Sequence, residues 1–133
     1  MNQDYDKAIM CFENALNDTP LYFSVCNYFL GISYEARGDK KPSKTNIDYD
    51  RSFRCLKRAL QAFVSNLGKD ELDTANCREH LGSVLFKQGK YEDARKSYDE
   101  ALRVKEIILG SDHEEVKDLR KIIQEIESKL SLA

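Results

Sequence analysis

The sequence has few of the features that interrupt helices or carry a chain into a membrane. Its 133 residues include only two prolines, and its wholly apolar runs are a few residues long. A membrane-spanning helix needs about 20 consecutive apolar residues. A secretory signal needs a basic start followed by an apolar segment, and Met1–Asp4 has neither feature. We expect no membrane insertion, and a protein of the cytosol or nucleus, with a cytoplasmic location as our prediction.

A strong net charge is also absent. The 21 basic and 23 acidic residues leave a formal net charge of −2, and the sequence pI is about 5.7. No strong field therefore draws the chain toward phosphate backbones or anionic lipid. Hydrophobic residues make up 41% and charged residues 33% of the chain, a balance that suits a soluble helical domain with an adequate core. Nucleic acid is not an expected partner.

The four cysteines form no C-x-x-C pair. Cys11 and Cys55 each follow a tyrosine by six residues, whereas Cys26 and Cys77 each precede a glycine by five. Equivalent positions indicate equivalent packing, so we expect buried or half-buried reduced thiols. Redox or metal chemistry is the alternative. We predict no metal site and no cofactor.

Motifs for catalysis are missing as well. The sequence contains no G-x-x-x-x-G-K-[ST], H-E-x-x-H or G-x-S-x-G, which rules out the commonest phosphate, zinc and nucleophile signatures. Its two histidines, His80 and His113, fall in different segments; we expect His113 at a helix start and His80 half-exposed on a helix. The chain is predicted not to be an enzyme, with a metal- or thiol-dependent enzyme as a remote alternative.

What the chain does contain is an internal repeat. Tyr49–Leu60 aligns with Tyr91–Leu102, and the same offset of 42 residues lays Leu67-Gly68 over Leu109-Gly110. A shorter third copy begins at Tyr5. Self-similarity with a period of a few tens of residues is typical of solenoids, in which each unit buries its apolar face against its neighbours.

Apolar residues at helical spacing predict a helix in each half of every repeat. The expected helices cover residues 5–17, 21–37, 48–66, 71–88 and 91–109, and a last helix follows to about residue 130. Gly38 is expected to stop the second helix. A capping box formed by Ser111 and Glu114 is expected to open the last one.

Two kinds of helix alternate. One contains Leu30-Gly31-x2-Tyr34 or Leu81-Gly82-x2-Leu85, in which glycine lets a partner helix approach closely; the other contains Ala94-x3-Tyr98-x2-Ala101, which receives that partner. This pattern resembles the tetratricopeptide repeat. Gln88-Gly89-Lys90-Tyr91 and the 42-residue period are most similar to the repeats of kinesin light chains, although Glu114 replaces their usual proline. The resemblance implies an all-α fold, a right-handed α-solenoid of antiparallel helix pairs with a C-terminal capping helix.

We therefore predict a single domain, residues 1–133, with four parts. Residues 1–20 form the second helix of a truncated repeat, 21–67 a repeat with an inserted loop at 39–47, 71–110 a complete repeat and 111–133 the capping helix. The missing first helix suggests a fragment of a larger protein. The insertion is either a tolerated surface loop or a partner-binding or phosphorylation loop that uses Lys40, Lys41, Lys44, Ser43 and Thr45.

In the family that the sequence resembles, the first helix of each repeat lines a concave groove that binds ligands. Transferred to this chain, with Tyr28 and Phe86 as the aromatic anchors, the groove residues are Val25, Tyr28, Ile32, Glu35, Asn76, Glu79, Ser83, Phe86 and Lys87. The carboxylate clamp of the chaperone-binding members is absent, because Phe29, Asn76 and His80 occupy its later positions. The paired asparagines of kinesin light chains are missing too.

The leading prediction is thus a non-catalytic scaffold that binds a peptide or helix of a partner protein in its concave groove. The alternative is a structural or self-associating end of a larger protein without a peptide ligand of its own. Its self-association face would be Ala8, Ile9 and Phe12, left uncovered by the missing helix, and a homodimer would form through them.

Overall fold

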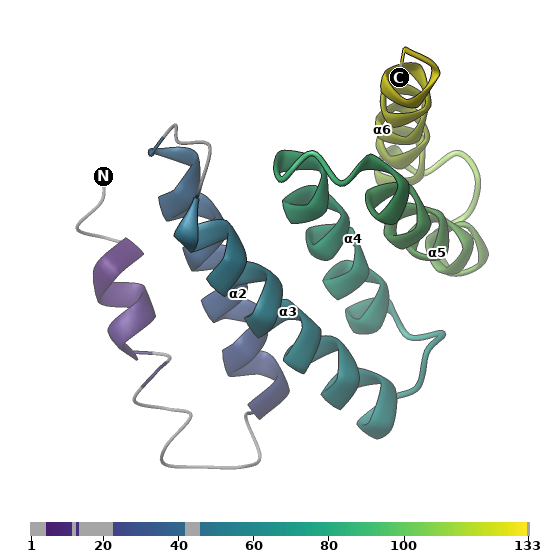
Figure 1. Ribbon diagram of the computed structural model, residues 1–133. Coiled ribbons are helices and arrows are strands. Elements are labelled where there is room, and N and C mark those ends of the chain that lie inside the picture. The colour runs from purple at the N-terminus through teal and green to yellow at the C-terminus, as the bar shows by residue number, and fades with distance from the viewer. Residues whose placement is uncertain (1–4, 12, 14–22, 42–45, 133) are drawn as a thin grey trace. The chain divides into compact units, whose positions relative to one another are not determined.

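The computed structural model describes residues 5–11, 13, 23–41 and 46–132, and every regular element in these ranges is a helix (Figure 1). Residues 5–11 are helical and precede five longer helices. These are α2 (Phe23–Asp39), α3 (Ile47–Asn66), α4 (Leu72–Lys87), α5 (Tyr91–Leu109) and α6 (Glu114–Ser131). The predicted all-α class is confirmed. The chain divides into two compact units, Met1–Asn66 and Leu67–Ala133, which are described separately.

The first unit is built on close packing of α2 against α3. A Cβ atom added to Gly31 would lie 2.5 Å from Leu56 Cγ, so only glycine leaves room for that side chain. One turn earlier on α3, the Ser52 hydroxyl donates a 2.6 Å hydrogen bond to the Gly31 carbonyl. Ser52 and Leu56 are both fully buried. The glycine therefore serves close helix approach, as the sequence predicts.

The second unit repeats this arrangement with α4 and α5. A Cβ atom on Gly82 would lie 2.7 Å from Tyr98 Cδ2, so Tyr98 fills the place that Leu56 fills in the first unit. Helix α6 packs against α5 and buries one stripe of its surface. The buried residues of that stripe are Val116, Leu119, Ile123 and Ile126. The rest of α6 is largely polar and exposed.

Two predicted helix boundaries are wrong. Gly38 does not end α2, which continues to Asp39; Gly38 is buried because the Tyr49 ring lies against it, 2.8 Å from the position of an added Cβ. Ser111 does not cap α6. The N-cap is His113, whose Nδ1 accepts a hydrogen bond from the Glu115 backbone N–H at 3.1 Å. The expectation of His113 at a helix start is confirmed.

Side chains tie together the two described flanks of the insertion. Asn46 caps α3, since its Oδ1 accepts from the backbone N–H groups of Asp48 at 3.1 Å and Tyr49 at 3.3 Å. Its Nδ2 donates to the Gly38 carbonyl at 2.9 Å. Ser43 and Thr45, the predicted modification sites, lie outside the described residues.

A bidentate ion pair closes the same junction. Arg37 Nε donates to Asp48 Oδ2 at 3.0 Å and Arg37 Nη2 to Asp48 Oδ1 at 2.8 Å, and Arg37 Nη1 reaches Asp6 at 2.6 Å. Asp48 is only 3% exposed. The hydrogen bonds from Arg37 hold the pKa of the Asp48 carboxyl below its ordinary value. Three segments of the first unit therefore meet at Arg37.

Candidate functional site

Helix α2 presents an apolar stripe at the surface of the first unit. Its members are Val25, Tyr28, Phe29 and Ile32, which helical spacing places along one side of the helix; we call these four residues the α2 stripe. Val25 and Phe29 are each 41% exposed, while Tyr28 and Ile32 are half-buried. The Tyr28 ring meets the Phe29 ring edge-on, with centroids 5.3 Å apart. The stripe thus offers two aromatic rings and two branched aliphatic side chains.

Tyr28 is held in place from the other helix of the pair. Its ring also meets Phe63 of α3 edge-on, at a centroid distance of 6.1 Å, and Phe63 is buried. An aromatic side chain fixed in this way loses little entropy when a partner covers it. Phe29 was not among the predicted site residues, although its position four residues after Val25 and three before Ile32 marks it as a member of the stripe.

Glu35 does not join the α2 stripe. Helical spacing places it on the same side of α2 as Tyr28, seven residues further along, but it is only 6% exposed. Burial and a hydrogen bond to Asp39 raise the pKa of Tyr49, and the charge of Glu35 adds to that rise. Glu35 therefore lies near the start of α3, inside the first unit.

The predicted residues of α4 form a more polar surface in the second unit. Asn76, Glu79, Ser83 and Phe86 are half-buried and Lys87 is exposed. The Phe86 ring packs edge-on against Tyr91 with centroids 5.3 Å apart, and Lys129 Nζ of α6 lies 5.8 Å from the Phe86 ring centroid. Phe86 is therefore in contact with both of the helices that follow α4.

Glu79 takes part in an ion-pair cluster across three helices. Lys105 Nζ of α5 lies 2.6 Å from Glu79 Oε2 and 3.2 Å from Glu115 Oε1 of α6. The lysine side chain is 1% exposed, whereas those of Glu79 and Glu115 are 33% and 53% exposed. Sequence analysis missed Lys105, because a lysine in an amphipathic helix is ordinarily a surface residue.

The predicted self-association face is partly covered within its own chain. Ile9 is 4% exposed and belongs to a buried cluster with Leu30, Tyr34 and Cys55. Ala8 is half-buried, and Phe12 lies outside the described side chains. The uncovered state expected for Ile9 is therefore not found, because α2 and α3 pack over it.

The cysteine side chains are mostly packing residues. Cys26, Cys55 and Cys77 are buried and Cys11 is exposed. Burial raises the pKa of the Cys77 thiol to about 12 and also raises that of Cys55, which disfavours the reactive thiolate. Within the described ranges, no three or more His, Cys, Asp and Glu residues are grouped so that they could hold a metal ion.

Comparison with known proteins finds one related repeat family. Residues 48–107, from α3 into α5, match the family model described as tetratricopeptide repeat. No curated protein matches the sequence. The match supports a tetratricopeptide repeat in this part of the chain and, with the all-helical fold, an α-solenoid. Such repeats generally mediate protein–protein interaction and are typically non-catalytic. No described helix is long and apolar enough to cross a membrane.

Proposed function

We propose that this chain is a non-catalytic scaffold that binds a peptide or helix of a partner protein, with the α2 stripe as its anchoring surface. The observation that carries the proposal is the exposure of Val25 and Phe29, at 41% each, beside the fixed ring of Tyr28. Binding energy concentrates in a few buried aromatic and aliphatic anchors. Four apolar side chains on one helix side suit the apolar face of an amphipathic partner helix or the alternate side chains of an extended peptide.

The predicted residues of α4 offer a more polar surface than the α2 stripe. Glu79 is held by Lys105, and Phe86 is packed against Tyr91. Asn76 and Lys87 lie at the surface with polar side chains, which suits hydrogen bonding to a peptide backbone or a carboxylate. In this proposal the α2 stripe supplies the affinity for the apolar partner, and the α4 positions are a separate, more polar surface of the second unit.

The test starts from a ligand of known sequence. A displayed library of peptides with apolar side chains at helical or alternating spacing is selected on the chain, and the best binder is titrated by calorimetry. Phe29→Ala should weaken its binding by a factor of about 30 or more, because truncating an aromatic anchor costs about 2 kcal/mol or more. Tyr28→Ala should act in the same direction.

Val64→Ala is the matched control. Val64 lies on α3 of the same unit and is 37% exposed, so the substitution removes a similar exposed apolar side chain outside the stripe. Unchanged binding by this variant, beside the loss in Phe29→Ala, supports the proposal. Equal binding by all variants contradicts it. Sedimentation of the free chain across a concentration series tests the alternative, since a dimer that Phe29→Ala dissociates would make the stripe a self-association surface.

A further inference from the structure

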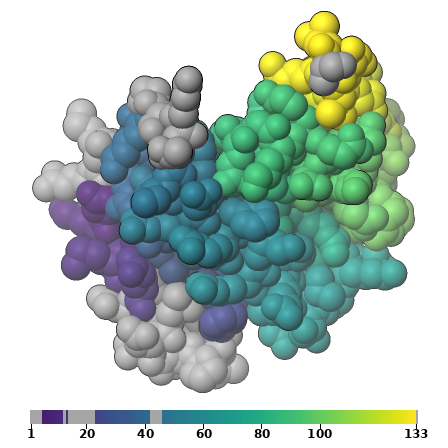
Figure 2. All heavy atoms as spheres, in the orientation of Figure 1, coloured from purple at the N-terminus to yellow at the C-terminus, as the bar shows by residue number. Residues whose placement is uncertain are grey.

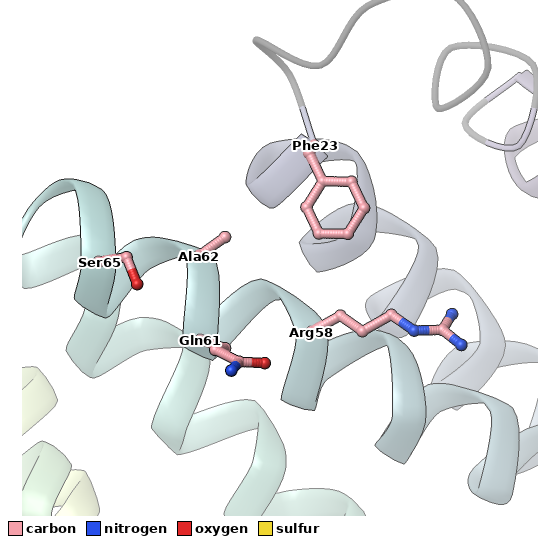
Figure 3. A pocket seen from close by; sticks show the side chains of 5 residues that line it. All are labelled: Phe23, Arg58, Gln61, Ala62 and Ser65. Carbon is pink, nitrogen blue, oxygen red and sulfur yellow. The ribbon is translucent and has the colours of Figure 1, made fainter.

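A second surface of the first unit combines a pocket with exposed arginine side chains. The pocket has a volume of about 400 Å³ and lies between the start of α2 and the second half of α3 (Figure 3). Its lining residues are Phe23, Arg58, Gln61, Ala62 and Ser65. Figure 3 shows the Phe23 ring reaching from α2 toward α3, with the other four side chains coming from α3. The pocket therefore has an apolar wall and a cationic one.

Arginines continue along the same side of α3. Arg51, Arg54 and Arg58 follow one another at intervals of three and four residues, so they line one face of the helix. Arg51 is engaged within the unit: its guanidinium lies over the Tyr34 ring, 5.8 Å from the centroid, and 3.9 Å from Asp48. In the described ranges, no ion pair or hydrogen bond joins Arg54 or Arg58 to another side chain, and both are exposed. Figure 2 shows atoms of α3 on the face of the first unit that is turned toward the viewer.

The charges of these arginines also reach a buried thiol of the first unit. Burial is the main cause of the raised pKa of Cys55, and the charges of Arg58 and Arg54 oppose that rise while the charge of Glu13 adds to it. Two cations and one anion thus act on the same buried thiol. Around this thiol, Arg54 and Arg58 are opposed by the single anion Glu13, although the whole chain carries a net charge of −2.

We propose that this surface binds an extended acidic segment of a partner protein. Two carboxylates would pair with Arg54 and Arg58, and a neighbouring apolar side chain would enter the pocket beside Phe23. Residues four apart on a helix are separated by about 6 Å along its axis, and alternate residues of an extended peptide are about 6.6 Å apart. The expected ligand therefore has acidic residues at every second position, followed by an apolar residue.

The chemistry favours carboxylates on a protein over other anions. An arginine guanidinium binds a carboxylate through two parallel hydrogen bonds, and the pocket of about 400 Å³ has room for a neighbouring apolar side chain. Nucleic acid and anionic membranes are bound by broad basic surfaces, whereas this surface offers two exposed arginines beside one pocket. The proposal uses no residue of the α2 stripe, so either surface can be tested without the other.

The experiment uses the full chain and a labelled peptide with two glutamates separated by one residue and followed by a leucine, measured by fluorescence anisotropy. Arg54→Gln and Arg58→Gln should each weaken binding about two- to fivefold, as for exposed ion pairs, and Phe23→Ala should weaken it by a similar factor. Added salt should weaken binding further. Lys117→Gln, the same change of charge at an exposed position of α6, is the matched control and should have no effect. Circular dichroism verifies that each variant remains folded.

A charge swap distinguishes direct contact between Arg58 and the peptide from long-range electrostatic attraction. Arg58→Glu should lose the acidic peptide and gain affinity for the version in which lysines replace its glutamates. Four outcomes would overturn the proposal: no binding by the unmodified chain, equal loss in Lys117→Gln, unchanged binding by both arginine variants, or failure of the charge swap. Binding of a phosphoserine peptide without binding of the glutamate peptide would overturn the assignment to carboxylates and replace it with a phosphopeptide ligand.

Discussion

The cluster at Lys105 makes a sharp prediction because burial is unequal among its members. The lysine side chain is 1% exposed, while Glu79 and Glu115 are 33% and 53% exposed. If both carboxylates lose their charge, a buried ammonium is left without a counterion. If the lysine loses its charge, the two carboxylates can still be solvated. Removal of the anions should therefore destabilise the chain more than removal of the cation.

The magnitudes follow from the same geometry. Breaking a fully buried pair by removing one partner costs about 3–5 kcal/mol, and the partial exposure of the glutamates reduces this to about 1–3 kcal/mol for Glu79→Gln with Glu115→Gln. Lys105→Met keeps the length and most of the volume of the side chain, so its cost should be within about 1 kcal/mol. Urea unfolding followed by circular dichroism measures both free energies.

A triple variant tests the reasoning itself. When Lys105→Met is added to the two glutamine substitutions, no buried charge remains, so the chain should recover most of the stability that the double variant lost. The reasoning would be refuted if the triple variant were less stable than the double variant by the full cost of Lys105→Met. In that case the lysine would contribute through packing of its stem and not as a charge that needs counterions.

Three further predictions concern packing, pH and thiols. Gly31→Ala should lower the free energy of unfolding by up to about 2 kcal/mol, because overpacking against Leu56 outweighs the helix propensity gained. In the background of Leu56→Ala, the same glycine substitution should no longer lower that free energy, as measured by urea titration. Asp48→Asn should lower the free energy of unfolding by about 1–3 kcal/mol near neutral pH. The pKa of Asp48 is lowered in the folded state, so the stability that its carboxylate contributes is complete above the ordinary pKa of 3.8 and is lost as pH falls toward the lower folded pKa. The melting curves of the variant and the unmodified chain should therefore converge in acid. Iodoacetamide should label Cys11 in the native chain well before Cys77, because burial raises the pKa of Cys77 to about 12. Mass spectrometry of digests measures both reactions, and equal rates of labelling would contradict the prediction.

The helix pairs were predictable because the sequence encodes them locally. The span of α5, Tyr91–Leu109, agrees with its prediction, since Gly110 with φ of 91° supplies a backbone conformation that ends a helix and favours glycine. The start of α6 was not predictable from the Ser111 and Glu114 spacing alone. The N-cap is the last residue before helical dihedral angles, and His113 has that extended conformation, with φ of −67° and ψ of 141°.

Side-chain burial at the candidate site was harder to predict. Helical spacing identifies which residues share a side of α2, and it places Phe29 with Val25. It does not say how far the neighbouring helix extends, which is why Glu35 was expected at the surface and is found buried next to the start of α3. Lys105 is a second case of the same kind, because its burial depends on α4 and α6 together.

The insertion shows which part of the repeat is under the stronger constraint. The chain between Gly31 and Leu56 is longer than that between Gly82 and Tyr98, yet each glycine meets the equivalent side chain of its partner helix. The register of a helix pair is thus set by contacts between the helices and not by the length of the connection, in keeping with the small cost of lengthening a loop. Asn46 caps α3 and bonds back to α2, which fixes the ends of the insertion. Residues between those ends can therefore vary without moving the surfaces of α2 and α3 on which both proposed binding sites depend.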